Sequence, residues 1–423
     1  MSTKTGLALC IHLTDSSADL YSPMQTTAPI PVSKWSYSEG KLDMESKAIG
    51  LKINLTQRDG IFSGHWKQGF LKEEITFYPS DTIFTLRRPQ TPQPPYRFDE
   101  ETITADYTDS QGNKVHIEGT LSIPKGTVSR CPCIVLVSGS GQQNRDEEIM
   151  QHKPFLVLAD YLATRGIAVL RYDDRGMGAS TGEVEKADTR LFSEDAEAMF
   201  NAIKTNSRIN PNRLGIGGHS EGGAIAPMVA ARNRDVKFVV MMAGQGCTGR
   251  DVLLQQNEAL FKAQGVSDSL VTIRLKVMAD VFGLEKNATQ AQYKDIVERY
   301  TKSLTTEQRD SIGLGKGAVY QLYKQMGNSW MQSFLTLNPA EYLPKVTCPI
   351  LAIQGTKDCQ VLAEPNLAGI TKLAGKRAQC QVFAGLNHLF QHCTTGSPDE
   401  YMLIEETFAP EAMKAVADFI LGL

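Results

Sequence analysis

The amino-acid sequence predicts an α/β protein, with a mainly parallel sheet covered by helices on both faces, preceded by a small N-terminal all-β domain. Three observations carry this prediction. Strand and helix patterns alternate over residues 133–243 and resume after residue 348, alternating apolar residues fill residues 35–78, and a proline-rich stretch separates the two patterns. Ligands bind beyond the carboxyl ends of the strands in such sheets, so the loops there are where we expect a site.

Composition excludes several classes of partner. The chain has 423 residues, 41% hydrophobic and 22% charged, as in an ordinary soluble protein. Its net charge of −3 and its scattered Lys and Arg residues predict no binding to nucleic acid. No apolar run approaches the roughly 18 residues that span a bilayer. The eight cysteines form no CxxC pair, and we expect neither a metal nor a cofactor.

The first residues carry no convincing signal peptide, since one Lys precedes an apolar stretch of only Leu7 to Leu13. As it stands, the sequence predicts a cytoplasmic protein. A leader that was removed or not included would make the protein periplasmic or secreted.

Residues 1–87 are expected to form the β-rich domain. Apolar residues alternate at Ile49, Leu51, Ile53 and Leu55. Asp59-Gly60 then predicts a hairpin turn, and "EEITFYP" and "TIFTL" add further strands. Four prolines between Pro89 and Pro95 cannot continue a sheet, so residues 88–98 are expected to be a linker.

Residues 99–423 are expected to form the α/β domain. It begins with a hairpin whose turn is Gln111-Gly112-Asn113. The strands predicted next are Cys133–Val137, Ile167–Tyr172, Arg213–Gly217, Phe238–Ala243, Cys348–Gly355 and Ala378–Gly385. The helices are Phe155–Thr164, Phe192–Lys204, Ser220–Arg232 and Pro410–Leu421.

Between about residues 247 and 340 the alternation gives way to helical periodicity. Residues 252–264 and 268–284 carry apolar side chains three and four apart. An all-helical insertion between consecutive strands, above their carboxyl ends, is well placed to be a lid.

The segment Gly218-His219-Ser220-Glu221-Gly222 matches the G-x-S-x-G nucleophile elbow. In that motif the serine lies on a tight turn from strand to helix, where the close approach of the backbone excludes a β-carbon two residues before and after it. A dinucleotide fingerprint would need glycine at position 220, and no P-loop lysine is present. We therefore expect Ser220 to be a nucleophile.

An elbow serine needs a base and an acid, which follow it in the order acid, then histidine. Asp358 and His388 each follow a predicted strand, in that order. His388 would take the proton of Ser220, and Asp358 would hold the imidazole in the right tautomer. His392 and Glu364 are rivals, although Glu364 lies where a helix is expected to start.

Acyl transfer also needs two backbone N–H groups directed at the developing negative oxygen. One is expected from Glu221, the residue after the nucleophile. The other is expected from the loop "SGSGQQNRDE" that follows the strand Cys133–Val137, with Ser140 first and Gly141 second.

From about Ile103 to the C-terminus the chain resembles an α/β-hydrolase. The segments "VLVSGSG", "YDDRGMGAST", "GIGGHSEGG", "GTKDCQV" and "GLNH" stand where that superfamily has its counterparts. The chain is most similar to bacterial esterases and serine-aminopeptidase-like hydrolases that carry an N-terminal β domain. Ser138-Gly139 replaces the usual His-Gly of the oxyanion loop, and Arg175 of "DDRGMGAS" is interpreted as structural.

The resemblance implies a serine carboxylesterase that acts on small or medium acyl substrates through an acyl-serine intermediate. The alternative is a serine aminopeptidase or another hydrolase of short peptides, which would need lid carboxylates such as Glu258, Asp280 or Glu285 to bind a free amine. A second alternative, a non-catalytic binding scaffold, is disfavoured by the intact set of Ser220, Asp358 and His388.

Overall fold

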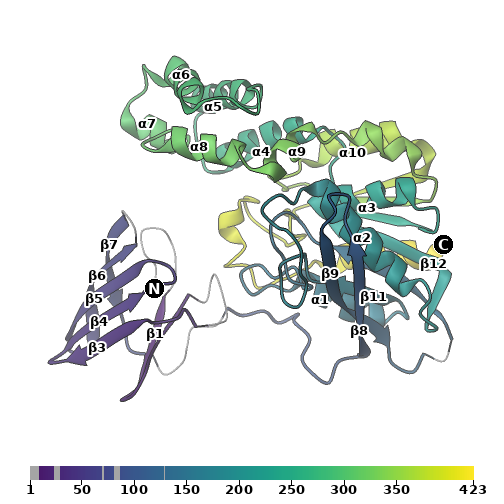
Figure 1. The fold of residues 1–423 in the computed structure, drawn as a ribbon, viewed down its shortest axis with the longest axis horizontal. Helices are drawn as coiled ribbons and strands as arrows, with labels where there is room; N and C mark the ends of the chain where they lie inside the picture. Colours follow the sequence, from purple (N-terminus) through teal and green to yellow (C-terminus); the bar gives the residue numbers. More distant parts are fainter. Residues whose placement is uncertain (1–8, 23–28, 69–70, 81–85, 128) are drawn as a thin grey trace. The chain divides into compact units, whose positions relative to one another are not determined.

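Eight strands form one mainly parallel sheet in the computed structural model, which describes residues 9–22, 29–68, 71–80, 86–127 and 129–423. The chain divides into two units. Unit 1 contains Met1–Pro89 with two short later segments, Ile149–His152 and Tyr401–Glu405, and unit 2 contains the rest (Figure 1).

The eight-stranded sheet lies in unit 2, with the strand order β15-β14-β13-β12-β10-β11-β9-β8. The strands are β8 (Phe98–Thr108), β9 (Lys114–Pro124), β10 (Cys131–Val137), β11 (Ala168–Tyr172), β12 (Ile209–His219), β13 (Val239–Met242), β14 (Ile350–Gly355) and β15 (Ala378–Phe383). β9 runs opposite to the other seven strands of this sheet, so its pairings with β8 and β11 are antiparallel and the remaining pairings are parallel. The predicted hairpin of β8 and β9 is confirmed, with Gly112 in its turn at a φ of 86°.

Helices cover both faces of this sheet, as predicted. They are α1 (Pro154–Ala163), α2 (Thr189–Ile203), α3 (Glu221–Arg232), α10 (Ala363–Ala374) and α11 (Pro410–Gly422). Side chains alternate along a strand, so β10 supplies both cores: Cys133, Val135 and Val137 belong to the cluster with α2, α3 and α10. Ile134 and Leu136 belong to the cluster with α1 and α11.

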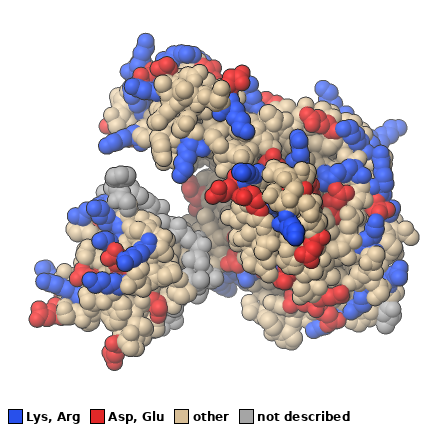
Figure 2. All heavy atoms as spheres, viewed as in Figure 1, with Lys and Arg blue, Asp and Glu red and all other residues tan. Residues whose placement is uncertain are grey.

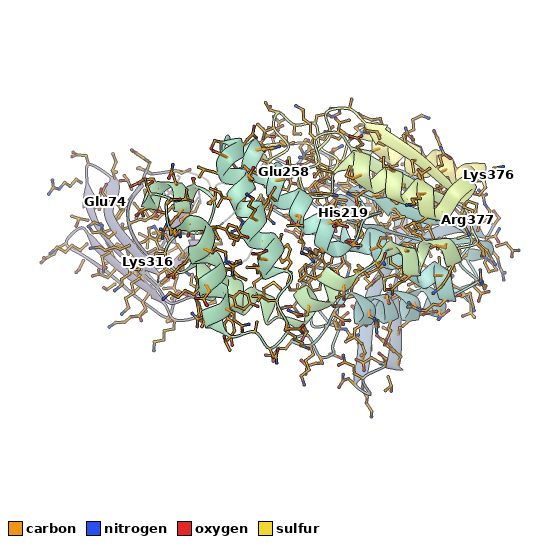
Figure 3. All side chains as sticks on the ribbon, turned by 90° about the horizontal axis from the view of Figure 1, so that it is seen from above. Glu74, His219, Glu258, Lys316, Lys376 and Arg377 are labelled. Carbon is orange, nitrogen blue, oxygen red and sulfur yellow. The ribbon has the colours of Figure 1, made fainter. Side chains whose placement is uncertain are left out.

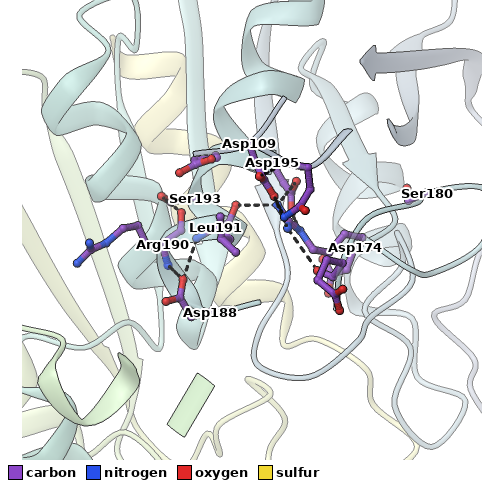
Figure 4. Close-up of polar contacts among 12 residues, drawn as sticks. Asp109, Asp174, Ser180, Asp188, Arg190, Leu191, Ser193 and Asp195 are labelled. Carbon is purple, nitrogen blue, oxygen red and sulfur yellow. Dashed lines mark hydrogen bonds and ion pairs between the residues drawn. The ribbon is translucent and has the colours of Figure 1, made fainter. Parts of the chain in front are cut away.

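Helix α2 begins one turn earlier than the expected helix Phe192–Lys204. Asp188 accepts hydrogen bonds from the N–H groups of Arg190 and Leu191, both at 3.0 Å (Figure 4). This N-cap satisfies two amides that a helix otherwise leaves unbonded, so the helix starts directly after Asp188.

The predicted helical insertion is present between β13 and β14. It comprises α4 (Gly249–Ala263), α5 (Asp268–Val281), α6 (Gln290–Thr301), α7 (Thr306–Ser311), α8 (Ala318–Met326) and α9 (Ser329–Thr336). These helices lie together on one side of the sheet (Figure 1), and α4, α5, α6, α8 and α9 share an apolar core of their own. Short 3-10 turns occur at Pro339–Glu341, Leu343–Lys345, Gly375–Arg377 and Pro398–Glu400. Among the described residues, none of the helices has the length and apolar character needed to cross a bilayer.

Unit 1 is antiparallel β-structure. Its described strands are β1 (Cys10–Leu13), β2 (Ala18–Tyr21), β3 (Lys34–Ser38), β4 (Lys41–Ser46), β5 (Leu51–Arg58), β6 (Ile61–Gln68) and β7 (Leu71–Phe77). β3 to β7 form a five-stranded sheet in chain order, and β1 pairs with β2. Leu51, Ile53 and Leu55 point into the core, as their alternation predicts.

Two expectations for unit 1 have different outcomes. The alternation predicts that Ile49 belongs to the strand, but in the structure Ile49 lies outside it. It lies in a turn that closes through the hydrogen bond from Gly50 N–H to Lys47 O, and it is 38% exposed. The strand expected at "TIFTL" falls almost wholly on residues 81–85, outside the described residues. On the face shown in Figure 2, acidic and basic side chains are interspersed on both units.

The interpretation of Arg175 as structural agrees with its contacts. Its fully buried guanidinium donates to Asp195 at 2.8 and 3.0 Å and to Asp109 at 3.3 Å. Both carboxylates are buried and lie in the network of Figure 4. The cluster joins the loop after β11 to α2 and to the turn after β8.

We expect Arg175→Ala to lower the free energy of unfolding by about 3–5 kcal/mol, because it leaves two buried carboxylates without their cation. Urea unfolding measures this. Arg130→Ala, at an exposed arginine, is the control and should change stability by no more than about 0.5 kcal/mol. Equal stability of the two variants would contradict a structural role for Arg175.

Candidate active site

Ser220 occupies the turn between β12 and α3. Its φ is 55° and its ψ −115°, so a non-glycine residue is held in the left-handed region. The turn is fixed by the hydrogen bond from Ser220 N–H to Met242 O, at 2.8 Å.

The glycines on either side of this turn permit close approach of the backbone. A β-carbon on Gly218 would lie 2.2 Å from Gly222 O, and one on Gly222 would lie 2.1 Å from Val137 O. Both distances are far inside van der Waals contact, so the segment can fold this way only with glycine at these two positions. The predicted strand-to-helix turn is therefore present at Ser220.

Asp358 and His388 meet at the carboxyl edge of the sheet. Asp358 follows β14, His388 follows β15, and His388 Nδ1 lies 2.8 Å from Asp358 Oδ2, with both side chains buried. The other oxygen, Asp358 Oδ1, accepts the N–H groups of Gln360 and Val361 at 2.8 and 2.9 Å. A carboxylate held in this way accepts the Nδ1 proton, which leaves Nε2 of the neutral ring as the acceptor.

His388 also contacts His219, the residue that precedes Ser220. The His219 and His388 rings are 4.7 Å apart between centroids, and His219 Nε2 lies 2.8 Å from His388 O. Among the described residues, no hydrogen bond joins Ser220 to His388 directly. The structure thus pairs Asp358 with His388 and places both beside the elbow.

The two rivals lie elsewhere. His392 is largely exposed and is paired with Glu406 at 2.8 Å and Glu411 at 3.1 Å. The hydrogen bond to Glu406 is the main reason that the pKa of His392 is raised. Glu364 lies in the first turn of α10, where an acidic side chain is favourable on helix grounds alone.

The loop after β10 contains Ser140 and Gly141, from which we expect one oxyanion donor. Gly139 N–H is engaged, since it donates to Glu147 Oε1 at 2.6 Å. Within the described residues, no hydrogen bond engages Ser140 N–H. Glu221 is the first residue of α3, and the N–H groups of a first helical turn have no partner inside the helix. Ser140 and Glu221 remain the candidates, with Gly141 as the alternative in the same loop.

Asp174 fixes the position of this loop through two hydrogen bonds, a role that the sequence analysis does not predict. It accepts Ser138 Oγ–H at 2.8 Å and Gln143 N–H at 2.9 Å. Burial raises the pKa of Asp174 to about 8, although both hydrogen bonds oppose the shift. Ser138, at the position usually held by histidine, thus serves the hydrogen bonding of the loop.

The Glu221 side chain connects the elbow to the helical insertion. Its carboxylate accepts Trp330 Nε1–H of α9 at 2.8 and 2.9 Å and Thr189 Oγ1–H at 2.6 Å. Burial raises the pKa of Glu221 to about 7, against the effect of both hydrogen bonds. The two contacts join residues 109 and 32 positions apart, so no local pattern could have predicted them.

A cleft of about 690 Å³ runs between the loop after β10 and the insertion. Its lining includes Ser140, Gln142, Phe192, Lys324, Asn328 and Trp330. The cleft therefore combines amide and aromatic groups next to a candidate oxyanion donor. Among the described residues, no group of three or more His, Cys, Asp or Glu side chains is arranged to hold a metal ion.

The sheet order, the strand-to-helix turn at Ser220 and the helical insertion define an α/β hydrolase. Residues 151–392, more than half of the chain, match the family described as serine aminopeptidase, S33. The chain belongs to this family, which confirms the resemblance read from the sequence.

Individual relatives are more distant. Esterase EstD of Thermotoga maritima is 27% identical over 314 residues, which cover 73% of this chain and 64% of the relative. The putative hydrolase YtaP of Bacillus subtilis is 28% identical over 141 residues, 29% of this chain and 46% of the relative. The chain thus spans less than two thirds of the length of either curated relative.

Two solved structures are similar to this chain at low sequence identity. A hypothetical protein from Pseudomonas aeruginosa is 19% identical and has a TM-score of 0.47, over 80% of this chain and 99% of that one. An esterase from Pyrococcus furiosus is 14% identical and has a TM-score of 0.45, over 80% and 98%.

The raised pKa of Glu221 predicts a pH-dependent stability. The folded state favours the protonated form of Glu221. The contribution of this group to the free energy of unfolding is therefore complete below pH 4.5 and is lost as the pH rises through about 7. Between pH 4.5 and 8 the wild type should lose about 3 kcal/mol of unfolding free energy relative to Glu221→Gln. Urea unfolding at a series of pH values tests this.

Glu364→Gln, at an exposed carboxylate, is the matched control and should follow the wild-type curve. Parallel curves for wild type and Glu221→Gln would show that Glu221 titrates alike in the folded and unfolded chain.

Proposed function

We propose that this chain is a serine hydrolase that cleaves carboxylic esters of small or medium acyl groups through an acyl-Ser220 intermediate. The observation that carries the proposal is the left-handed strand-to-helix turn at Ser220, beside the buried pair of His388 and Asp358. Such a turn exposes a hydroxyl at the edge of the sheet, and the pair supplies an oriented base.

The proposed reaction assigns one role to each residue. His388 Nε2 takes the proton of Ser220 Oγ while that oxygen attacks the ester carbonyl carbon, and Asp358 stabilises the imidazolium that forms. The carbonyl oxygen, now negative, is stabilised by the N–H groups of Ser140 and Glu221. His388 then gives the proton to the leaving alkoxide, and a water molecule repeats the sequence to release the acid.

An ester substrate is favoured over a peptide by the state of the insertion carboxylates. Glu258, labelled in Figure 3, lies on α4 and accepts a hydrogen bond from Lys262 Nζ at 2.7 Å. Asp280 accepts Tyr300 Oη–H at 2.9 Å and lies 3.3 Å from Arg299, and Glu285 is exposed. Glu258 and Asp280 are thus each already paired with side chains of the insertion. The name of the relative EstD also supports an esterase.

Aminopeptidase activity remains the second candidate because of the family description. We further propose that the helical insertion acts as a lid, because its Trp330 contacts the residue after the nucleophile and its α8 and α9 line the cleft. The side chains of the insertion would then set the choice of acyl group.

Ser220→Ala should lower kcat for p-nitrophenyl acetate and butyrate by at least about a thousand-fold, because the acyl-enzyme can no longer form. A fluorophosphonate probe followed by mass spectrometry should place an adduct on Ser220 of the wild type. Ser207→Ala, at an exposed serine, is the control and should keep full turnover and labelling.

Aminoacyl-4-nitroanilides, assayed in parallel, separate the two enzyme candidates. Faster cleavage of these amides than of the esters would favour the aminopeptidase. A folded wild type with neither turnover nor adduct would contradict both and favour a binding scaffold.

A further inference from the structure

A buried pair of side chains next to the proposed triad is not used by the reaction. Glu147 and His219 are 4% and 7% exposed, and His219 Nδ1 lies 3.0 Å from Glu147 Oε1. The same Oε1 accepts Gly139 N–H at 2.6 Å, and His219 Nε2 lies 2.8 Å from His388 O. One chain of three hydrogen bonds therefore connects the oxyanion loop, the elbow and the loop of His388.

The partners of His219 define its protonation. A backbone carbonyl can only accept, so Nε2 must donate to His388 O, and a carboxylate likewise accepts from Nδ1. When Glu147 is ionised, both ring nitrogens carry protons, and His219 is then an imidazolium paired with the Glu147 carboxylate. Burial acts to lower the pKa of His219, but the charge and hydrogen bond of Glu147 outweigh it and raise that pKa.

A gain in folding stability does not by itself explain why Glu147 and His219 are buried together. Desolvation of two buried charges consumes much of their attraction, and one oxygen of Glu147, Oε2, is buried without a hydrogen-bond partner among the described residues. Glu147 also has a φ of 51°, which is unfavourable for a residue with a side chain. Side chains and backbone kept in such unfavourable states are typical of functional sites, where the exact position of a group matters.

We propose that Glu147 and His219 are positioning residues that fix the backbone of His388 and of the oxyanion loop relative to Ser220. The proposal rests on the proposed function. His219 is bonded directly to Ser220, and Gly139 to Ser140, so the pair ties base, nucleophile and oxyanion donor together. A displacement of about 1 Å at such a site costs on the order of a hundred-fold in rate.

Two amide substitutions separate the contacts of His219. Gln carries an N–H donor near the place of Nε2 and can keep the bond to His388 O, while Asn carries one near Nδ1 and can keep the bond to Glu147. We expect Glu147→Gln and His219→Asn to lower kcat for p-nitrophenyl acetate by roughly 10- to 100-fold with KM within about three-fold, and His219→Gln to keep more of kcat. The rate of fluorophosphonate labelling of Ser220 should fall in parallel with kcat.

His152→Gln is the matched control, because His152 is also buried and contacts a backbone carbonyl, Tyr401 O at 2.9 Å, and has no part in the proposed reaction. It should keep wild-type kcat whatever it does to the melting temperature. If Glu147→Gln does not fold, the proposal is tested by comparing His219→Asn with His219→Gln. Both variants carry a neutral amide, and they differ in which hydrogen bond of His219 they can keep.

The outcomes are distinguishable from those for the proposed function. An active wild type whose Glu147→Gln and His219→Asn variants keep full kcat would overturn the positioning role and leave the esterase standing. An inactive wild type without an adduct on Ser220 would overturn both.

Discussion

The close contact between the elbow and the end of β10 is the constraint on which the site depends. With glycine at position 222, the first turn of α3 lies against Val137 O, where a β-carbon would be only 2.1 Å away. The loop that contains Ser140, the proposed oxyanion donor, begins at the next residue, Ser138. Backbone contact at this one point therefore brings the loop beside Ser220, and no side chain of either segment has to bridge the distance.

Buried carboxylates hold the loops around this contact. Asp174 accepts from two groups of the oxyanion loop, Asp358 from two amides and a histidine, and Glu147 from Gly139 and His219. Each carboxylate fixes several donors at once, so loops without regular structure gain defined positions. Such preorganised polar groups do not have to reorient when charge develops during a reaction.

The sequence predicts the parts of the structure that depend on near neighbours. Alternation of strands and helices predicts the sheet, and the glycines around Ser220 predict the tight turn. The helix predicted from Phe192 begins three residues earlier in the structure, where Asp188 caps it, although an aspartate before a helix is itself a local signal. The pairs Glu147–His219 and Glu221–Trp330 join residues 72 and 109 positions apart, so they emerge only when the fold is known.

The contact between Glu221 and Trp330 has a consequence for movement of the insertion. If α9 moves away from α3, the Glu221 carboxylate loses both bonds to the indole and keeps only Thr189 as a partner. Water would then reach a group whose pKa is raised by burial, and the charged form would become easier to maintain. Because burial outweighs the hydrogen bonds from Trp330 in raising the pKa of Glu221, ionisation of this carboxyl would favour separation of the two helices.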